Sequence, residues 1–295
     1  MPRAALCAGI AALIDFQLLW FRVRIDATKA HPSAAEVLSF LVQNAHQDDL
    51  EPTRTLQLEV ADRGCGFQLR EFGSIGQWVA DSTELLDAVY QLVHQRVFDE
   101  ATFRGWVRLH SATFDLGSTR CLLVGPSGAG KTTLSCALVL NGIDVQADEN
   151  TFIRGGVALP LPRPFHLKAG MEHYVPCLRE HTGGLPAVRE GAVRAWCPRV
   201  DGPWTIDKRR VDLIVFIRRD AHSTRAERLE TASAFGSLLE HSYRGSETIR
   251  PVVRELATVL RNAPAFSMTW RTAVEAVDQL QTLIKSGPTT PTSER

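Results

Sequence analysis

The chain has 295 residues, of which 44% are hydrophobic and 22% charged, the balance of a soluble globular protein. Lysine and arginine together number 33, as do aspartate and glutamate, so the formal net charge is zero. This balance gives no support for a chain built to bind nucleic acid or an anionic membrane. The six cysteines are scattered without a CxxC pair, which indicates a reducing, cytoplasmic location and no zinc site.

A short apolar run covers residues 4–14, directly after Arg3. The run is too short to span a bilayer, and Asp15 behind it is a poor context for signal-peptide cleavage. We interpret it as a first helix or an over-extended start, with a targeting segment as the alternative.

Residues 1–103 are predicted to form a small α+β domain. Asp81 and Glu84 give an Asp-x-x-Glu start signal for a helix that runs to about Val97. The other expected elements are a strand at 18–25, a helix at 33–44 and a hairpin from 55–60 and 66–71. The domain shows no catalytic constellation, so we expect it to dock an acceptor or partner.

Residues 104–285 are predicted to form an α/β domain, followed by a disordered tail at 286–295. The run 211–217 is almost wholly apolar, as in a strand buried on both faces. The other expected strands are 106–114, 120–124 and 143–147, and the expected helices are 132–140, 226–241, 248–262 and 271–285.

A glycine-rich segment between a predicted strand and helix matches the pattern G-x-x-x-x-G-K-[ST] in full. Glycines let the loop backbone point several N–H groups at one anion, and the helix N-terminus adds its positive dipole end. The lysine reaches the β- and γ-phosphates and the threonine hydroxyl can ligate Mg²⁺, so the motif predicts ATP and Mg²⁺ binding. The residues are Gly125, Pro126, Ser127, Gly128, Ala129, Gly130, Lys131 and Thr132, with Thr133 next.

Asp148 and Glu149 end the next predicted strand, 17 residues after Lys131. Strand C-termini in an α/β sheet face the ligand crevice, and adjacent residues there point in different directions. One carboxylate can therefore hold metal while the other meets the acceptor of the phosphoryl group.

Several further side chains are weaker candidates. His110 is predicted to end a strand 21 residues before Lys131. Arg163 and Lys168 follow a proline-rich stretch, where they would clamp a phosphate or substrate or else form a solvated basic loop. Arg218, or Arg219 beside it, would neutralise charge on the transferred phosphoryl group or else form a surface ion pair.

These residues, taken together, resemble the catalytic core of HPr kinase/phosphorylase. The resemblance rests on the segments LHSA at 109–112, GPSGAGKTTL at 125–134 and ADE at 147–149. The further segment RPFHLK at 163–168 makes the chain similar to HPr-kinase-related kinases of biosynthetic clusters. The resemblance covers about residues 105–280 and implies a PEP-carboxykinase-like P-loop core, with a strongly bent mixed sheet.

The resemblance also implies roles for the residues. Asp148 would be the general base, Glu149 and Thr132 would handle Mg²⁺, and His110 would support Asp148 by hydrogen bonding or by charge. The implied substrate is a serine of a small protein or ribosomal peptide precursor, beside a PqqD-like peptide chaperone in some relatives. Self-association is implied too. The alternatives are a kinase of free serine and a non-catalytic ATP-binding switch in a peptide-modifying complex.

Overall fold

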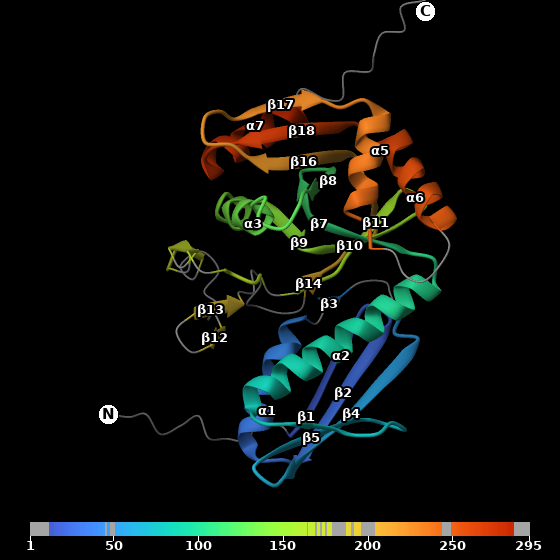
Figure 1. Ribbon diagram of the computed structural model, residues 1–295, viewed down its shortest axis with the longest axis vertical. Helices are drawn as coiled ribbons and strands as arrows, with labels where there is room; N and C mark the ends of the chain where they lie inside the picture. Colours follow the sequence, from blue (N-terminus) through green and yellow to red (C-terminus); the bar gives the residue numbers. More distant parts are fainter. Residues whose placement is uncertain are drawn as a thin grey trace, which may run out of the picture. The chain divides into compact units, whose positions relative to one another are not determined.

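The computed structural model describes residues 12–44, 46–47, 51–163, 165–168, 170–171, 173–174, 176–178, 187–189, 192–195, 204–243 and 249–285. The chain divides into two compact units, Met1–Glu100 with Asp201–Thr205, and Ala101–Val200 with Ile206–Arg295 (Figure 1). The short piece 201–205 belongs to the first unit, which the sequence did not indicate. Most of the apolar run 4–14 and the whole tail 286–295 lie outside the described residues. None of the helices within the described ranges combines the length and the apolar character that crossing a bilayer requires.

A five-stranded sheet in the order β1-β2-β4-β5-β6 forms most of the first unit. Strands β2 and β4 are parallel, and the other neighbours are antiparallel. A short parallel pair, β3 with β14, lies apart from this sheet. The elements are β1 (Leu13–Leu18), β2 (Phe21–Lys29), α1 (Pro32–Leu38), a 3-10 helix (Ser39–Asn44), β3 (His46–Gln47), β4 (Arg54–Arg63), β5 (Gly66–Glu71), β6 (Gln77–Val79), α2 (Ser82–Phe103) and β14 (Trp204–Thr205).

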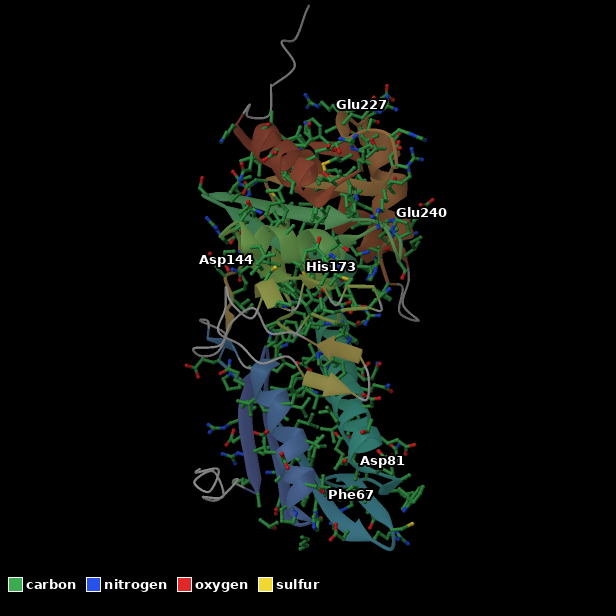
Figure 2. The ribbon with its side chains drawn as sticks, turned by 90° about the vertical axis from the view of Figure 1, so that its left-hand side faces the viewer. Phe67, Asp81, Asp144, His173, Glu227 and Glu240 are labelled. Atoms are coloured by element: carbon green, nitrogen blue, oxygen red, sulfur yellow. The ribbon has the colours of Figure 1, made fainter. Side chains whose placement is uncertain are left out.

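Helix α2 begins where the sequence predicts. The Asp81 carboxylate accepts hydrogen bonds from the backbone N–H groups of Thr83 at 2.8 Å and Glu84 at 2.9 Å, which caps the helix (Figure 2). Its apolar stripe is buried, with Val89 and Val97 fully inaccessible. The predicted helix is therefore confirmed, and it continues to Phe103. The predicted hairpin of β4 and β5 is confirmed as well.

The single strand predicted at 18–25 is wrong, because the chain turns within it. Strands β1 and β2 pair as a hairpin in which Leu18 faces Phe21. Leu19 takes a left-handed conformation at φ 49°, a position that usually carries glycine or asparagine. Residues 18–21 are all buried, so the apolar run gave no sign of the turn.

The second unit is built on a mixed, bent sheet in the order β15-β11-β10-β7-β8-β16-β18-β17, with β9 also paired to β7. Strands β8, β16 and β18 are mutually parallel. The elements are β7 (Val107–Leu116), β8 (Thr119–Val124), α3 (Lys131–Leu140), β9 (Asp144–Ala147), β10 (Asn150–Arg154), β11 (Val157–Pro160), β12 (Ala187–Arg189), β13 (Ala192–Ala195), β15 (Arg209–Arg210), β16 (Leu213–Arg219), β17 (Arg225–Arg228), α5 (Thr231–Glu240), α6 (Ile249–Asn262), β18 (Ala265–Trp270) and α7 (Ala273–Lys285).

The sheet bends at strand β7, because the two halves of this strand have different neighbours. Its second half pairs with β8 on one edge and β9 on the other. Its first half pairs with β10, while its opposite edge bonds to residues 241–243. Strands β9 and β10 therefore follow one another along one edge of β7, with two residues between them.

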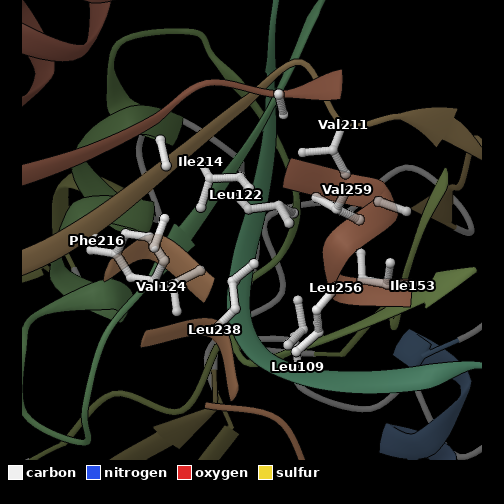
Figure 3. Packing of buried hydrophobic residues seen from close by; sticks show 14 of the residues in the cluster. Leu109, Leu122, Val124, Ile153, Val211, Ile214, Phe216, Leu238, Leu256 and Val259 are labelled. Carbon is white, nitrogen blue, oxygen red and sulfur yellow. The ribbon is translucent and has the colours of Figure 1, made fainter. Parts of the chain in front are cut away.

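The central strands are covered by helices on both faces. Leu122 and Val124 of β8 pack in one apolar cluster with Leu238 of α5 and Leu256 of α6 (Figure 3). Because side chains alternate along a strand, Leu123, which is also fully buried, points to the opposite face. Helices α3 and α7 pack against each other, and α3 also contacts β7 and β9. This arrangement fixes the C-terminal end of β8, from which the glycine-rich segment leaves.

Several strands of the second unit were not predicted, and β17 shows why. The expected helix 226–241 is wrong in its first part, where Arg225–Arg228 forms the edge strand β17. Its partner β18 was not predicted at all. The four residues of β17 show no strand pattern of their own, and they extend because β18 supplies the backbone hydrogen bonds.

A buried ion pair joins β7 to β8 far from the glycine-rich segment. The Arg120 guanidinium is inaccessible to solvent and donates to both Asp115 carboxylate oxygens, at 2.8 and 2.7 Å. We expect Asp115→Ala to lower the free energy of unfolding by about 3–5 kcal/mol, because it leaves the Arg120 charge buried and unpaired. Thermal unfolding should show a fall of roughly 10 °C in the melting temperature.

The double variant Asp115→Leu/Arg120→Met is the control for this prediction. It removes both charges, so it should be clearly more stable than Asp115→Ala alone. Equal losses in the two variants would mean that the volume of these side chains matters and their pairing does not.

Candidate active site

The glycine loop, residues 125–130, connects β8 to α3 and is the structural centre of the site. Gly128 and Gly130 adopt left-handed conformations at φ 87° and φ 96°, which the predicted anion-binding loop requires. Lys131 is only 6% exposed, and its Nζ donates to the carbonyls of Gly125 at 2.6 Å and Pro126 at 3.2 Å. Burial lowers the pKa of Lys131 to about 8. Its charge is therefore held inside the loop.

The acidic pair, Asp148 and Glu149, forms the two-residue connection between β9 and β10. Asp148 is 2% exposed, and its Oδ2 accepts a hydrogen bond from Thr132 Oγ1 at 3.0 Å. Its Oδ1 is buried and has no hydrogen-bond partner among the described residues. Burial raises the pKa of Asp148 to about 6, despite the opposing charge of Arg163. A buried carboxylate with a free oxygen beside Thr132 is suited to accept a proton or hold a cation.

Arg163 brings the proline-rich segment into the site. It forms an ion pair with Glu149, and its Nε lies 3.9 Å from Asp148 Oδ1. Lys168 of the same segment lies with its Nζ 3.4 Å from Ser127 Oγ in the glycine loop. The two basic residues thus contact the two halves of the site, the acidic pair and the loop.

His110 lies in the middle of β7, not at its end as the sequence predicted, because the strand continues through its bend to Leu116. It is opposite Asn150 in the register, so it faces the interruption that carries the acidic pair. Burial, and after it the charge of Lys131, lowers the pKa of His110 to about 4, so the ring is neutral at neutral pH. Its Nδ1 is buried without a hydrogen-bond partner among the described residues. Of the two modes left open above, hydrogen bonding fits this ring and charge does not.

These residues line one pocket of about 460 Å³. Arg218 is not among the residues that line it, because consecutive side chains of β16 alternate and Arg219 reaches the pocket instead. His166 and Met171 also line it, and the sequence offered no signal for Met171. The predicted residues that line the pocket are His110, Ser127, Gly128, Gly130, Lys131, Thr132, Thr133, Asp148, Glu149, Arg163 and Lys168.

The donor set near the acidic pair fits one kind of metal ion. Within the described residues, no group of three or more His, Cys, Asp or Glu side chains could hold a metal by itself. Mg²⁺ is commonly bound by one or two carboxylates together with substrate phosphates and water. Asp148, Glu149 and the Thr132 hydroxyl offer that partial set, and the free Oδ1 of Asp148 is an available ligand.

Comparisons with known proteins give only a weak likeness, to solved structures. No protein-family model matches the sequence, and no curated protein matches it. Among solved structures, the chain is similar to the Hpr(Ser) kinase/phosphatase from Coxiella burnetii. The TM-score is 0.31 and the sequence identity 11%, over 61% of this chain and 94% of that chain. This likeness is too low to assign the chain to a family.

Proposed function

We propose that this chain is an ATP-dependent kinase that transfers the γ-phosphoryl group to a hydroxyl group. The observation that carries the proposal is the arrangement around Thr132. The hydroxyl that would ligate Mg²⁺ bonds to Asp148, a buried carboxylate, at the start of the helix that the glycine loop opens. A phosphate cradle, a metal ligand and a base therefore meet in one pocket.

The chemistry assigns one task to each side chain. The oxygen of the acceptor hydroxyl bonds to the γ-phosphorus, and Asp148 accepts the proton that this hydroxyl loses. The bond between that phosphorus and the oxygen bridging it to the β-phosphate breaks, which leaves ADP. Lys131 and the loop N–H groups stabilise the negative charge on the transferred group. Mg²⁺, held by Glu149 and Thr132, would neutralise charge on the β- and γ-phosphates.

His110 and Arg163 support these groups. The neutral His110 ring can donate a hydrogen bond to the reacting carboxylate, which would fix its orientation without adding charge. Arg163 already pairs with Glu149 and lies near Asp148, so its charge offsets part of the cost of two adjacent carboxylates. Once phosphates and metal bind, the same guanidinium can turn to the transferred group.

The acceptor that we propose is a serine of a small protein or peptide, following the resemblance of the core motifs. The test is transfer of label from γ-labelled ATP with Mg²⁺ to free serine, to HPr and to serine-containing peptides. Label on a protein or peptide supports the proposal, and label on free serine alone would redirect it to a small molecule. Tight ATP binding without label on any acceptor would favour an ATP-binding switch.

Lys131→Ala is expected to reduce transfer by about 10²–10³-fold and to weaken ATP binding as well. The reason is that Lys131 is a buried cation directly after the glycine loop, and the backbone N–H groups cannot replace its charge. Initial rates and calorimetric ATP titration measure the two effects. A variant with undiminished ATP affinity would show that the loop does not cradle the phosphates.

A further inference from the structure

An arginine stacked on a buried tryptophan lies at one end of the pocket and has no part in the mechanism above. Arg219 and Trp270 are the last residues of β16 and β18 and are register partners. The Arg219 guanidinium carbon lies 5.3 Å from the centroid of the Trp270 ring. At this distance the guanidinium is attracted to the ring face. Trp270 is 1% exposed, whereas the Arg219 side chain is exposed and lines the pocket.

Trp270 fixes this pair relative to the glycine loop. Its Nε1 donates a hydrogen bond to the Ala129 carbonyl at 3.1 Å. Arg219 makes no ion pair with any carboxylate among the described residues. Its guanidinium therefore lies over the tryptophan ring and is not committed to an acidic partner.

The Arg219–Trp270 pair and the acidic residues belong to strands on opposite sides of β8. In the sheet, β7 lies on one side of β8, together with β9 and β10, which flank Asp148 and Glu149, and β16 lies on the other side. The charges that act on Lys131 come from Glu149, Asp148 and Lys168. Since the γ-phosphate must meet Asp148, the other side of β8, where Arg219 ends β16, is open to the rest of the nucleotide.

We propose that Arg219, which lies over Trp270, stacks on the base of the bound nucleotide and forms its nucleobase subsite. The inference rests on the proposed function, since it places the part of ATP that does not react. Guanidinium planes and aromatic bases stack through their faces, which needs no hydrogen bond to the base edge. Met171 lines the same pocket with its sulfur 3.9 Å from Thr133 Oγ1, and a thioether is a favourable contact for an aromatic ring.

The test compares ATP with inorganic tripolyphosphate, which carries the same phosphate chain without base or sugar. Calorimetric titrations with Mg²⁺ are run on the wild type, Arg219→Ala and Arg219→Lys. We expect both variants to bind ATP at least about tenfold more weakly, and to bind tripolyphosphate like the wild type. Lysine keeps the charge but lacks the plane, so its failure to rescue separates stacking from charge.

Arg271→Ala is the matched control, because Arg271 follows Trp270 directly, is exposed and does not line the pocket. It should bind both ligands like the wild type. A parallel loss of ATP and tripolyphosphate in Arg219→Ala would make Arg219 a phosphate contact and overturn the inference. Equal affinity of the wild type for both ligands would overturn it too while leaving the phosphate cradle intact. Binding of neither ligand by the wild type would overturn the proposed function itself.

Discussion

Asp148→Asn is expected to reduce phosphoryl transfer by about 10²–10⁴-fold and to leave the dissociation constant for ATP nearly unchanged. The amide keeps the size of the carboxylate, and its single oxygen can still accept the Thr132 hydrogen bond, but it cannot take a proton. Steady-state rates at saturating acceptor measure the first effect, and calorimetry measures the second. Unchanged turnover would remove Asp148 from the role of base.

The same substitution should stabilise the protein when nucleotide and metal are absent. Burial raises the pKa of Asp148 from its ordinary value to about 6, so folding disfavours the ionised carboxylate. A shift of this size corresponds to a cost of up to about 3 kcal/mol in the free energy of unfolding, which the neutral amide avoids. A rise in melting temperature together with lost activity would mark Asp148 as a residue kept for chemistry at the expense of stability.

The stability gained by Asp148→Asn should depend on pH. With a raised native pKa, the wild type loses stability as pH rises from the carboxyl group's unfolded pKa of 3.8 to its native value of about 6. The asparagine variant has no such loss at this position. The difference in melting temperature should therefore be near zero at the acid end of this range and full above it.

Local sequence was enough to predict the glycine loop, the helix after it and the place of the acidic residues. The glycine loop and the start of α3 follow from residues 125–132 alone, because glycine conformation and helix initiation are decided within a few residues. Asp148 and Glu149 were predicted at the end of a strand, and they follow β9 directly. For the same reason, the capped start of α2 at Asp81 was predicted correctly.

Contacts between distant segments were not predictable. Trp270 and Ala129 are 141 residues apart, and nothing near Trp270 in the sequence signals that it supports the glycine loop. The choice of Arg219 over Arg218 depends on the phase of β16, which its neighbours in the sheet set. The position of His110 in mid-strand depends on the bend of β7, which results from its changing partners.

Gly130→Ala is expected to abolish most nucleotide binding, although it adds a single methyl group. A Cβ at this position would lie 2.2 Å from Trp270 Cζ2, closer than any van der Waals contact allows. Trp270 cannot move aside freely, because it is buried and its indole N–H is bonded to Ala129 in the same loop. The φ of 96° would cost a further 1–2 kcal/mol or so for an alanine. The loop must therefore shift, and its N–H groups then no longer point at one anion.

Gly128→Ala separates these two causes. Gly128 has a similar φ of 87°, but an added Cβ there would meet no atom within 4 Å. The backbone cost is thus nearly the same in both variants, and only Gly130→Ala adds the collision. We expect calorimetry to show a loss of ATP affinity of about tenfold for Gly128→Ala, and a much larger loss for Gly130→Ala.

Trp270→Phe provides a second test, since phenylalanine lacks the Cζ2 atom that the new methyl group would strike. Alone, it should weaken ATP binding modestly, because the Ala129 carbonyl loses its donor. Combined with Gly130→Ala, it should restore part of the lost affinity, which a double-mutant cycle measures as a coupling between the two positions. Strictly additive losses would mean that the tryptophan does not set the shape of the loop. A favourable coupling would make Trp270 the residue through which β18 holds the glycine loop in its binding conformation.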